Sequence, residues 1–422
     1  MRFLAILGLL AVGAVLSFTS IGLASAFYLW HNIFRPLNFA WAEGSLPTAQ
    51  LVIVLLIASY FLNLLRRKFK PRFTVFFWLT MIFMGWVWVC GYLTIRTPPA
   101  YMNITTMEGV ILIAKYLGPI ALISTCLVTM ADVRLAVLTM TLSVATWGAW
   151  LGLGGIRYGV NPKMCIPGGQ LSERNYFAAA VACVMPLLLY FAKSYRGRYP
   201  QMVRWGLLAM FVMNGAVIVF SGSRGAVVAV VGMIVLFVAV VSDSKIKHGI
   251  LILILGAIVY SVLPDSFFKR METIDLSAEQ TEGSAKERTL LMRSAYRCTL
   301  DHPLFGVGPI CWEAISPAYT GLRRMMQPHS MWLLCSAETG WPGLAMLVLI
   351  LLITVFRLLR LARRARLAGD MDRSTLAKAL VVSILGYSIG LTFLNHYYME
   401  LWWGLLAAAN CLCSLPERRR IA

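Results

Sequence analysis

The chain has 422 residues, of which 59% are hydrophobic and 13% are charged, and its formal net charge is +20. Soluble domains carry about 25% charged residues, so the composition excludes an ordinary soluble protein and indicates a polytopic membrane protein. The basic residues fall mostly in short loops between apolar segments. This pattern argues against nucleic acid as a partner and is the one that membrane orientation requires.

Apolar segments recur along the whole chain. A membrane-spanning helix needs about 20 predominantly apolar residues, and we identify twelve candidate segments. They are residues 3–32, 48–65, 73–95, 108–130, 134–153, 175–192, 203–220, 225–242, 247–264, 330–356, 375–394 and 398–414. The first is long enough to be broken near residues 17–20, and then it would form a short hairpin. No cleavage site followed by a polar domain appears after it, so we expect a span rather than a signal peptide.

The distribution of basic residues orients these segments. If the N-terminus is cytoplasmic and the first segment is one span, the dense basic clusters fall in cytoplasmic loops, as the positive-inside rule requires. The clusters are residues 66–72, 132–134, 193–204, 242–247, 357–373 and 418–420. The sequence therefore predicts one all-α membrane domain over residues 1–422, with about twelve spans and both termini in the cytoplasm.

The longest loop in this scheme, residues 265–329, lies on the periplasmic side and carries many basic residues. A loop of this length without structure of its own is uncommon. Apolar and basic positions alternate with a helical period over residues 285–300, which predicts an amphipathic helix that ends at Asp301-His302-Pro303. Three of the nine cysteines, Cys165, Cys298 and Cys311, face the oxidising side in this topology, so a disulfide among them stays open.

Arg224 lies in the motif Ser221-Gly-Ser-Arg224-Gly-Ala226 at the boundary between two predicted spans. The planar guanidinium group of arginine can hold a phosphate through two parallel hydrogen bonds, which lysine cannot do. An arginine at a helix end also occurs simply because its side chain reaches the membrane surface. The motif alone leaves both interpretations open.

Further arginines lie on the same side of the membrane. Arg288 and Arg293 belong to the amphipathic helix of the long loop, and Arg174 begins the sixth span. A basic helix at the membrane surface can present arginines to a lipid head group or a diphosphate. It can equally be an ordinary solvated helix face, and the spacing does not decide between the two.

His329 follows Pro328 directly before the tenth span, at the expected boundary between membrane and water. A neutral imidazole there can act as a general base near neutral pH, or it can simply bond a loop carbonyl. Glu338 lies nine residues deeper, where a carboxylate needs a partner. The acids of the long loop form no compact metal-binding pattern, so we expect neither a metal nor another cofactor.

Three motifs follow one another along the chain, and their order and spacing are more specific than any one of them alone. They are Ser223-Arg-Gly-Ala226, Arg288 with His302-Pro-Leu-Phe-Gly-Val-Gly308-Pro309, and His329-Ser330 with Glu338-Thr-Gly340. Together they resemble the bacterial O-antigen ligase and polymerase superfamily of integral-membrane glycosyltransferases, which have a GT-C-like fold. The segments beginning at Tyr28 and at Arg174 are also similar to a branch described as O-glycosylation ligases associated with exosortase systems.

The resemblance implies a glycan donor linked to undecaprenyl diphosphate, used at the periplasmic face of the inner membrane. By position, Arg224 and Arg288 correspond to the superfamily's essential arginines and His329 to its essential histidine. Arg174 and Arg293 would then assist in binding the diphosphate. The expected reaction is a metal-independent, inverting glycosyl transfer.

Several functions fit this resemblance. We expect an O-antigen ligase whose acceptor is a sugar hydroxyl of the lipid A–core, with membrane lipids as further partners. A polysaccharide polymerase and a protein O-glycosylation ligase are the alternatives within the superfamily. A lipid-linked glycan flippase is the alternative from another class. It would need charged residues in mid-membrane, and Glu108, Lys115 and Glu338 keep it open.

Overall fold

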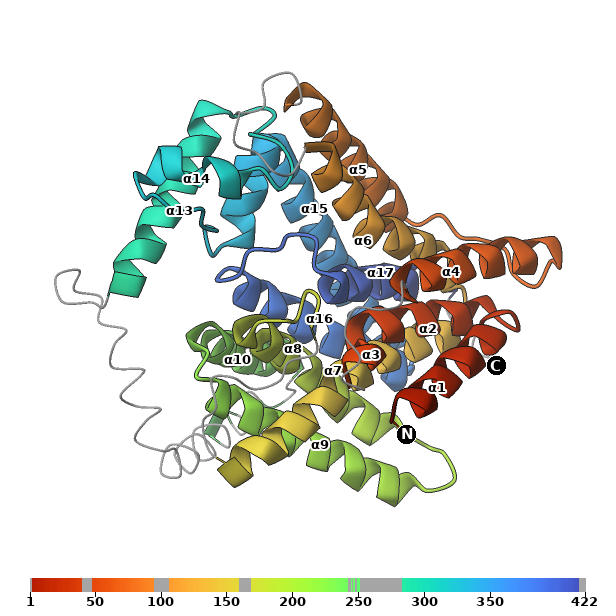
Figure 1. Ribbon diagram of the computed structural model, residues 1–422. Helices are drawn as coiled ribbons and strands as arrows, with labels where there is room; N and C mark the ends of the chain where they lie inside the picture. Colours follow the sequence, from red (N-terminus) through yellow and green to blue (C-terminus); the bar gives the residue numbers. More distant parts are fainter. Residues whose placement is uncertain are drawn as a thin grey trace.

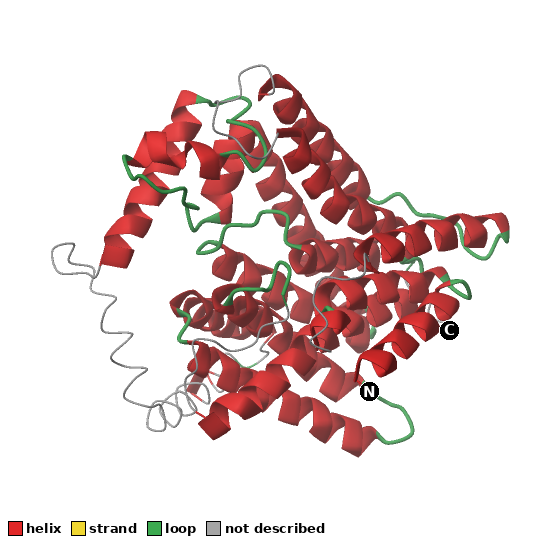
Figure 2. Ribbon diagram, viewed as in Figure 1, coloured by secondary structure: helices red, strands yellow, loops and turns green. Residues whose placement is uncertain are grey.

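The computed structural model describes residues 2–39, 48–94, 106–158, 168–241 and 283–416, together with a few positions between 244 and 250. Within these ranges the chain forms helices joined by loops, and the only β-type pairing is an isolated bridge between Gly168 and Leu171 (Figure 2). The predicted all-α membrane fold is confirmed. Apart from residues 249 and 250, the predicted span 247–264 and the following residues up to 282 lie outside the described residues.

The helices are arranged as one bundle with a helical element at one side (Figure 1). In chain order they are α1 (Arg2–Ser17), α2 (Ile21–Phe34), α3 (Pro36–Phe39), α4 (Thr48–Leu65), α5 (Val75–Thr94), α6 (Thr106–Cys126), α7 (Met130–Tyr158), α8 (Arg174–Ser194), α9 (Pro200–Ser221), α10 (Arg224–Leu236), the π-helical turn η1 (Phe237–Val241), α13 (Gly283–Asp301), α14 (Trp312–Thr320), α15 (Met331–Leu367), α16 (Met371–Leu391) and α17 (Glu400–Ser414). Nine helices of the described part are long and apolar enough to cross a membrane. They coincide with nine predicted spans.

The first predicted span is a hairpin. The helices α1 and α2 have 16 and 14 residues and are joined by residues 18–20, where the Ser20 hydroxyl accepts a hydrogen bond from the Gly22 amide and so starts α2. The two helices pack closely, because the ring of Phe27 occupies the space that a side chain at Gly13 would need. The break that the sequence left open therefore exists.

Several turns gather at one end of the bundle, which we call the basic end: residues 18–20, 66–74, 127–129, 195–199, 368–370 and 415–416. Hydrogen bonds join them. The Lys68 ammonium group donates to the Thr19 carbonyl at 3.3 Å, and the Arg72 guanidinium donates to the Ser414 carbonyl at 2.7 Å. Arg134 pairs with Asp372 at 2.7 Å. The predicted cytoplasmic clusters that the structure describes thus lie together at one end.

The hairpin changes the predicted position of the N-terminus. Since the α1–α2 turn lies at the basic end, α1 begins at the opposite end, which we call the loop end, where it packs against α3. The prediction of an N-terminus on the side of the basic clusters is therefore wrong. The error arises because the sequence argument counted residues 3–32 as one crossing. The predicted side of every later basic cluster is unchanged. The hairpin adds one membrane crossing, and the N-terminus moves to the opposite side, so the two changes cancel for all later loops.

The helices α8, α16 and α17 form the centre of the bundle. Their side chains are buried on nearly all sides, and small residues such as Ala178–Ala182 in α8 and Ala407–Ala409 in α17 let neighbouring helices approach closely. The helix α17 has 15 residues, and all but its last two are buried in the bundle. This centre supports the residues at the loop end.

We predict that the basic end faces the cytoplasm and the loop end faces the outside. In intact spheroplasts, an impermeant thiol reagent should label Met325→Cys at the loop end but not Leu367→Cys at the basic end, since both native side chains are exposed. Wild type is the control for background, because seven of the eight described native cysteines are buried. Labelling of Leu367→Cys alone would reverse the orientation.

Candidate active site

The short loop of residues 392–399 between α16 and α17 connects the elements that carry the predicted site residues. The Trp332 indole of α15 donates to the Thr392 hydroxyl at 3.0 Å. The ring of Phe393 lies against Gly225 of α10, and the Asn395 amide donates to the Tyr176 hydroxyl of α8 at 2.9 Å. The beginnings of α8, α10 and α15 therefore meet on one loop at the loop end.

Arg224 is the first residue of α10. The preceding turn is closed by Gly222 in a left-handed conformation (φ 59°), and the Ser223 hydroxyl caps the helix by accepting a hydrogen bond from the Ala226 amide at 3.4 Å. This local geometry explains the small residues of the motif, since a helix must end and another begin within two residues. It places a half-buried arginine at a helix N-terminus, where the helix dipole also favours an anion.

Arg288 and Arg293 lie on different faces of α13. This helix confirms the amphipathic segment predicted at 285–300, and it buries one stripe of residues against α14 and α15: Leu291, Ser294, Ala295, Cys298 and Thr299. Arg288 precedes Ala295 by seven residues, about two turns, so it extends this stripe beyond the packed region. Arg293 lies about 200° around the helix from Ala295, on the exposed outer face. The structure does not bring Arg293 to the same place as Arg288, contrary to our expectation.

His329 lies two residues before α15 with a positive φ of 51°, and its side chain is half-buried. Burial lowers the pKa of its imidazole below the ordinary value of 6.5, and the positive charge of Arg288 lowers it further, while Glu173 and Glu287 act in the opposite direction. These groups are therefore close enough to influence His329. The imidazole is neutral at pH 7, which is the form that can accept a proton.

Arg174 is the first residue of α8 and is half-buried beside Glu173, whose carboxylate accepts a hydrogen bond from the Asn175 side chain at 2.8 Å. Because Glu173 influences the pKa of His329, the start of α8 lies near that histidine. At the loop end, His329 is therefore close to Arg288 and to the start of α8. The starts of α8 and α10, which carry Arg174 and Arg224, contact the same loop 392–399 as the start of α15. The local field of these three helix N-termini strongly favours a bound anion.

The loop 392–399 and its histidine are not part of any motif described above. The His396 ring stacks on Tyr176, with ring centroids 5.0 Å apart, and contacts Tyr398 in a tilted arrangement at 5.2 Å. Tyr398 in turn stacks on Tyr116 at 5.8 Å. Burial lowers the pKa of His396 to about 4, so this ring is neutral as well. The available signal was a run of polar and aromatic residues, Asn395-His396-Tyr397-Tyr398, between two apolar segments.

Glu338 has a structural role. Its carboxylate is buried and accepts hydrogen bonds from the Trp312 amide at 3.4 Å and from the Tyr397 hydroxyl at 3.0 Å. It therefore fastens the start of α14 to the loop 392–399. Glu108 and Lys115 are the other charged residues that left a flippase as an alternative function. Both are exposed on α6 rather than buried between helices.

The helix α15 is broken at Gly340, which has φ 70° and ψ −176°. The segment 303–308 docks into this break: the Val307 amide donates to the Ala337 carbonyl at 2.9 Å, and the Trp341 amide donates to the Pro303 carbonyl at 2.8 Å. The indole of Trp86 satisfies the Thr339 carbonyl at 2.8 Å. The two motifs around Gly306 and Gly340 thus fit each other by backbone pairing, which accounts for their glycines without any chemical role.

The cysteines of the long loop are not paired with each other. Cys298 and Cys311 are free thiols in buried positions, and burial raises the pKa of each to about 12. The disulfide that the sequence left open does not join these two, and Cys165 lies outside the described residues. Within the described ranges, no group of three or more His, Cys, Asp or Glu residues has the arrangement of a metal site.

A comparison with protein families finds a similarity over one segment of the chain. The family described as O-antigen ligase matches residues 208–348, a segment that contains Arg224, Arg288, His329 and Glu338. The match confirms the resemblance to the O-antigen ligase and polymerase superfamily and indicates a membrane glycosyltransferase type of function. Arg174 and the loop 392–399 lie outside the matched segment. No curated protein matches the chain.

We predict that Gly340→Ala destabilises the protein and disrupts the site. A residue with a side chain is strained at this positive φ, which costs about 1–3 kcal/mol, and its Cβ would collide with the Leu304 carbonyl. The melting temperature of the purified protein in detergent measures the effect. Gly85→Ala in α5 is the matched control, because nothing lies within 4 Å of its added Cβ. Equal melting of the two variants would contradict the role of the break.

Proposed function

We propose that the protein is an O-antigen ligase that transfers a glycan from undecaprenyl diphosphate to a sugar hydroxyl of the lipid A–core at the periplasmic face of the inner membrane. The observation that carries this proposal is that the starts of α8, α10 and α15, which carry or adjoin Arg174, Arg224 and His329, contact one loop at the loop end, where Arg288 also influences His329. The family match to residues 208–348 supports the class of reaction. The donor, the acceptor and the membrane side are parts of the proposal.

The arginines bind and neutralise the diphosphate. As the bond between the sugar anomeric carbon and the diphosphate oxygen breaks, its electron pair moves to that oxygen and negative charge develops there. Arg224 and Arg288 stabilise this charge, Arg174 assists, and the N-terminus of α10 adds its positive end. In other glycosyl transfers a metal ion neutralises the leaving diphosphate. Here the arginine side chains do so, and the proposed mechanism uses no metal or other cofactor.

His329 accepts the proton of the acceptor hydroxyl. The acceptor oxygen attacks the anomeric carbon from the side opposite the leaving group, with inversion, while its proton moves to the imidazole. The lowered pKa of His329 keeps the ring neutral and able to accept at pH 7, because burial and Arg288 both disfavour its charged form. Arg288 then serves two purposes, since it binds the donor and keeps the base unprotonated.

A reconstituted assay tests the function. Purified protein, mixed with an undecaprenyl-diphosphate-linked glycan and lipid A–core, should release undecaprenyl diphosphate and extend the lipid A–core. Movement of the donor without release would indicate a flippase.

Deletion of the gene should remove the long lipopolysaccharide ladder while free lipid-linked glycan accumulates. A single-repeat band would identify a polymerase, and an unchanged ladder with a lost glycoprotein would identify a protein O-glycosylation ligase.

We predict that Arg224 of α10 and Arg288 of α13 are needed for glycan transfer, whereas Arg293 on the other face of α13 is not. Arg288→Ala and Arg224→Ala should lower turnover by about 10²–10³-fold, because contacts to charge that develops in the transition state act on that step. Arg288→Lys should recover little, since lysine cannot form the planar pair of hydrogen bonds. Initial rates with saturating donor measure both effects.

Arg293→Ala is the matched control on the same helix, because both arginines are exposed but Arg293 lies on a different face of α13. It should transfer at a rate near that of wild type. Equal losses in Arg288→Ala and Arg293→Ala would show that α13 needs its general positive charge rather than a specific arginine. Full activity of Arg288→Lys would show that the geometry of the guanidinium group is irrelevant.

We predict that His329→Ala abolishes transfer but keeps donor binding, because the arginines hold the diphosphate. General base catalysis contributes about 10²–10⁴-fold. In wild type, turnover should fall as pH drops through the lowered pKa, so this acidic limb should lie below pH 6.5. Donor affinity and the pH–rate profile measure the two parts. Activity that rises on acidification, with weaker donor binding in His329→Ala, would instead make the imidazolium a phosphate ligand.

A further inference from the structure

A second basic site lies at the basic end, far from the candidate active site. A cavity of about 510 Å³ opens between the end of α8 and the start of α9. Three cationic side chains, Lys193, Arg196 and Arg204, line it together with polar groups of Tyr195 and Gln201. Among the described residues that line this cavity, none is acidic. The cavity is thus of the size of a small-ligand site and carries a concentrated positive charge.

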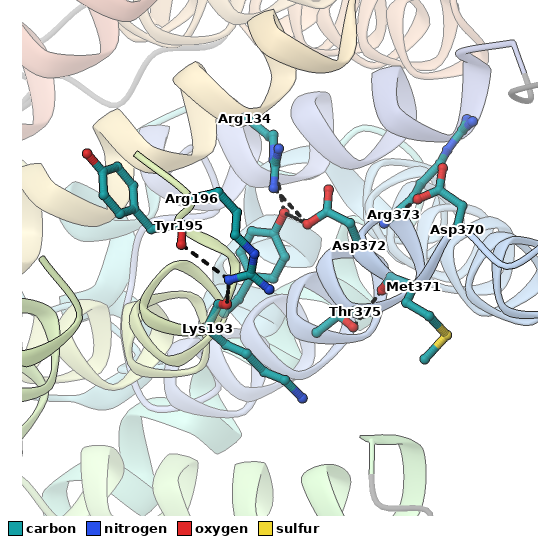
Figure 3. A network of polar contacts seen from close by, with 10 residues as sticks. Arg134, Lys193, Tyr195, Arg196, Asp370, Met371, Asp372, Arg373 and Thr375 are labelled. Atoms are coloured by element: carbon teal, nitrogen blue, oxygen red, sulfur yellow. Dashed lines mark hydrogen bonds and ion pairs between the residues drawn. The ribbon is translucent and has the colours of Figure 1, made fainter. Parts of the chain in front are cut away.

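The backbone between α8 and α9 holds one of these cations in place. Figure 3 shows the Arg196 guanidinium group turned back towards the end of α8, where one nitrogen donates to the carbonyls of Lys193 at 2.9 Å and Tyr195 at 3.2 Å. Asp372 is engaged elsewhere, because it accepts hydrogen bonds from Arg134 at 2.7 Å and from the Tyr190 hydroxyl at 3.0 Å. It does not line the cavity and so does not neutralise it directly.

The surroundings of the cavity indicate a lipid surface. Exposed aromatic and apolar side chains flank it: Tyr199 is 54% exposed, Trp205 67% and Met202 68%. Tyrosine and tryptophan prefer the boundary between acyl chains and head groups. These side chains begin the spanning helix α9, so the cavity lies at the depth of the phospholipid head groups. A soluble anion would need the cations but not these flanking side chains.

We propose that this cavity binds the phosphate of an anionic phospholipid head group and that Lys193, Arg196 and Arg204 are its ligands. Basic pockets between transmembrane helices take up such head groups, and the N-terminus of α9 adds a favourable helix dipole. The bound lipid joins the end of α8 to the start of α9 beside the loop that links them, residues 195–199. Because α8 also carries Arg174 at its other end, the lipid stabilises a helix that the active site uses. The proposal does not depend on the transferred glycan.

Thermal unfolding of the purified full chain in an uncharged detergent tests the proposal. Titration with short-chain phosphatidylglycerol should raise the melting temperature, whereas phosphatidylcholine should not. In Lys193→Gln/Arg196→Gln/Arg204→Gln, the half-saturating lipid concentration should rise by about 100-fold, since each basic side chain near an anionic lipid contributes about fivefold. Lys193→Gln/Arg204→Gln keeps the Arg196 bonds to the backbone and should show about 25-fold by the same reasoning.

The matched control is Arg66→Gln/Lys70→Gln/Arg198→Gln, which removes three exposed charges from the same end but none from the cavity; Arg198 lies over the Tyr199 ring. It should keep the wild-type response. Equal loss in the control and cavity variants would show general attraction to the basic end and overturn the site. Equal stabilisation by inorganic phosphate would make it a site for a free anion and overturn the assignment to lipid.

Discussion

Inside a membrane every backbone polar group needs a partner within the protein, and the break in α15 frees backbone groups that must be satisfied in this way. The helix is interrupted at Gly340, and its freed groups are satisfied by the segment 303–308 and by the Trp86 indole. Because that segment directly follows α13, the pairing also fixes where α13 lies. The position of Arg288 and the start of α15 at His329 therefore both depend on the same backbone contacts.

Positive charge at the two ends of the bundle has different causes. At the basic end, the cations lie in the turns where membrane orientation requires them, and they bond carbonyl groups or pair with acids such as Asp372. At the loop end, which we predict to face the outside, the positive-inside rule disfavours basic residues, yet Arg174, Arg224 and Arg288 lie there near three helix N-termini. The arginine side chains and the helix N-termini are both positive, so they repel one another electrostatically. This arrangement costs free energy unless a bound anion neutralises it.

The sequence predicts the parts of this structure that local pattern determines. Hydropathy located nine spans, and periodicity located α13, because both depend on residues close together in the chain. The direction of α1 could not be obtained that way, since it depends on whether residues 18–20 form a turn. The separation of Arg288 from Arg293 required knowledge of which stripe of α13 is buried. The loop 392–399 gains its importance only from contacts with α8, α10 and α15, which lie far away in sequence.

The structure also separates two kinds of residue within the motifs that resemble O-antigen ligases. Gly306, Gly340 and Glu338 are explained by packing and hydrogen bonds, so their presence argues for the fold rather than the chemistry. His329 differs from them, because it adopts a positive φ that is unfavourable for a residue with a side chain. This conformation holds a half-buried imidazole near Arg288, where we propose that an acceptor hydroxyl meets a bound diphosphate.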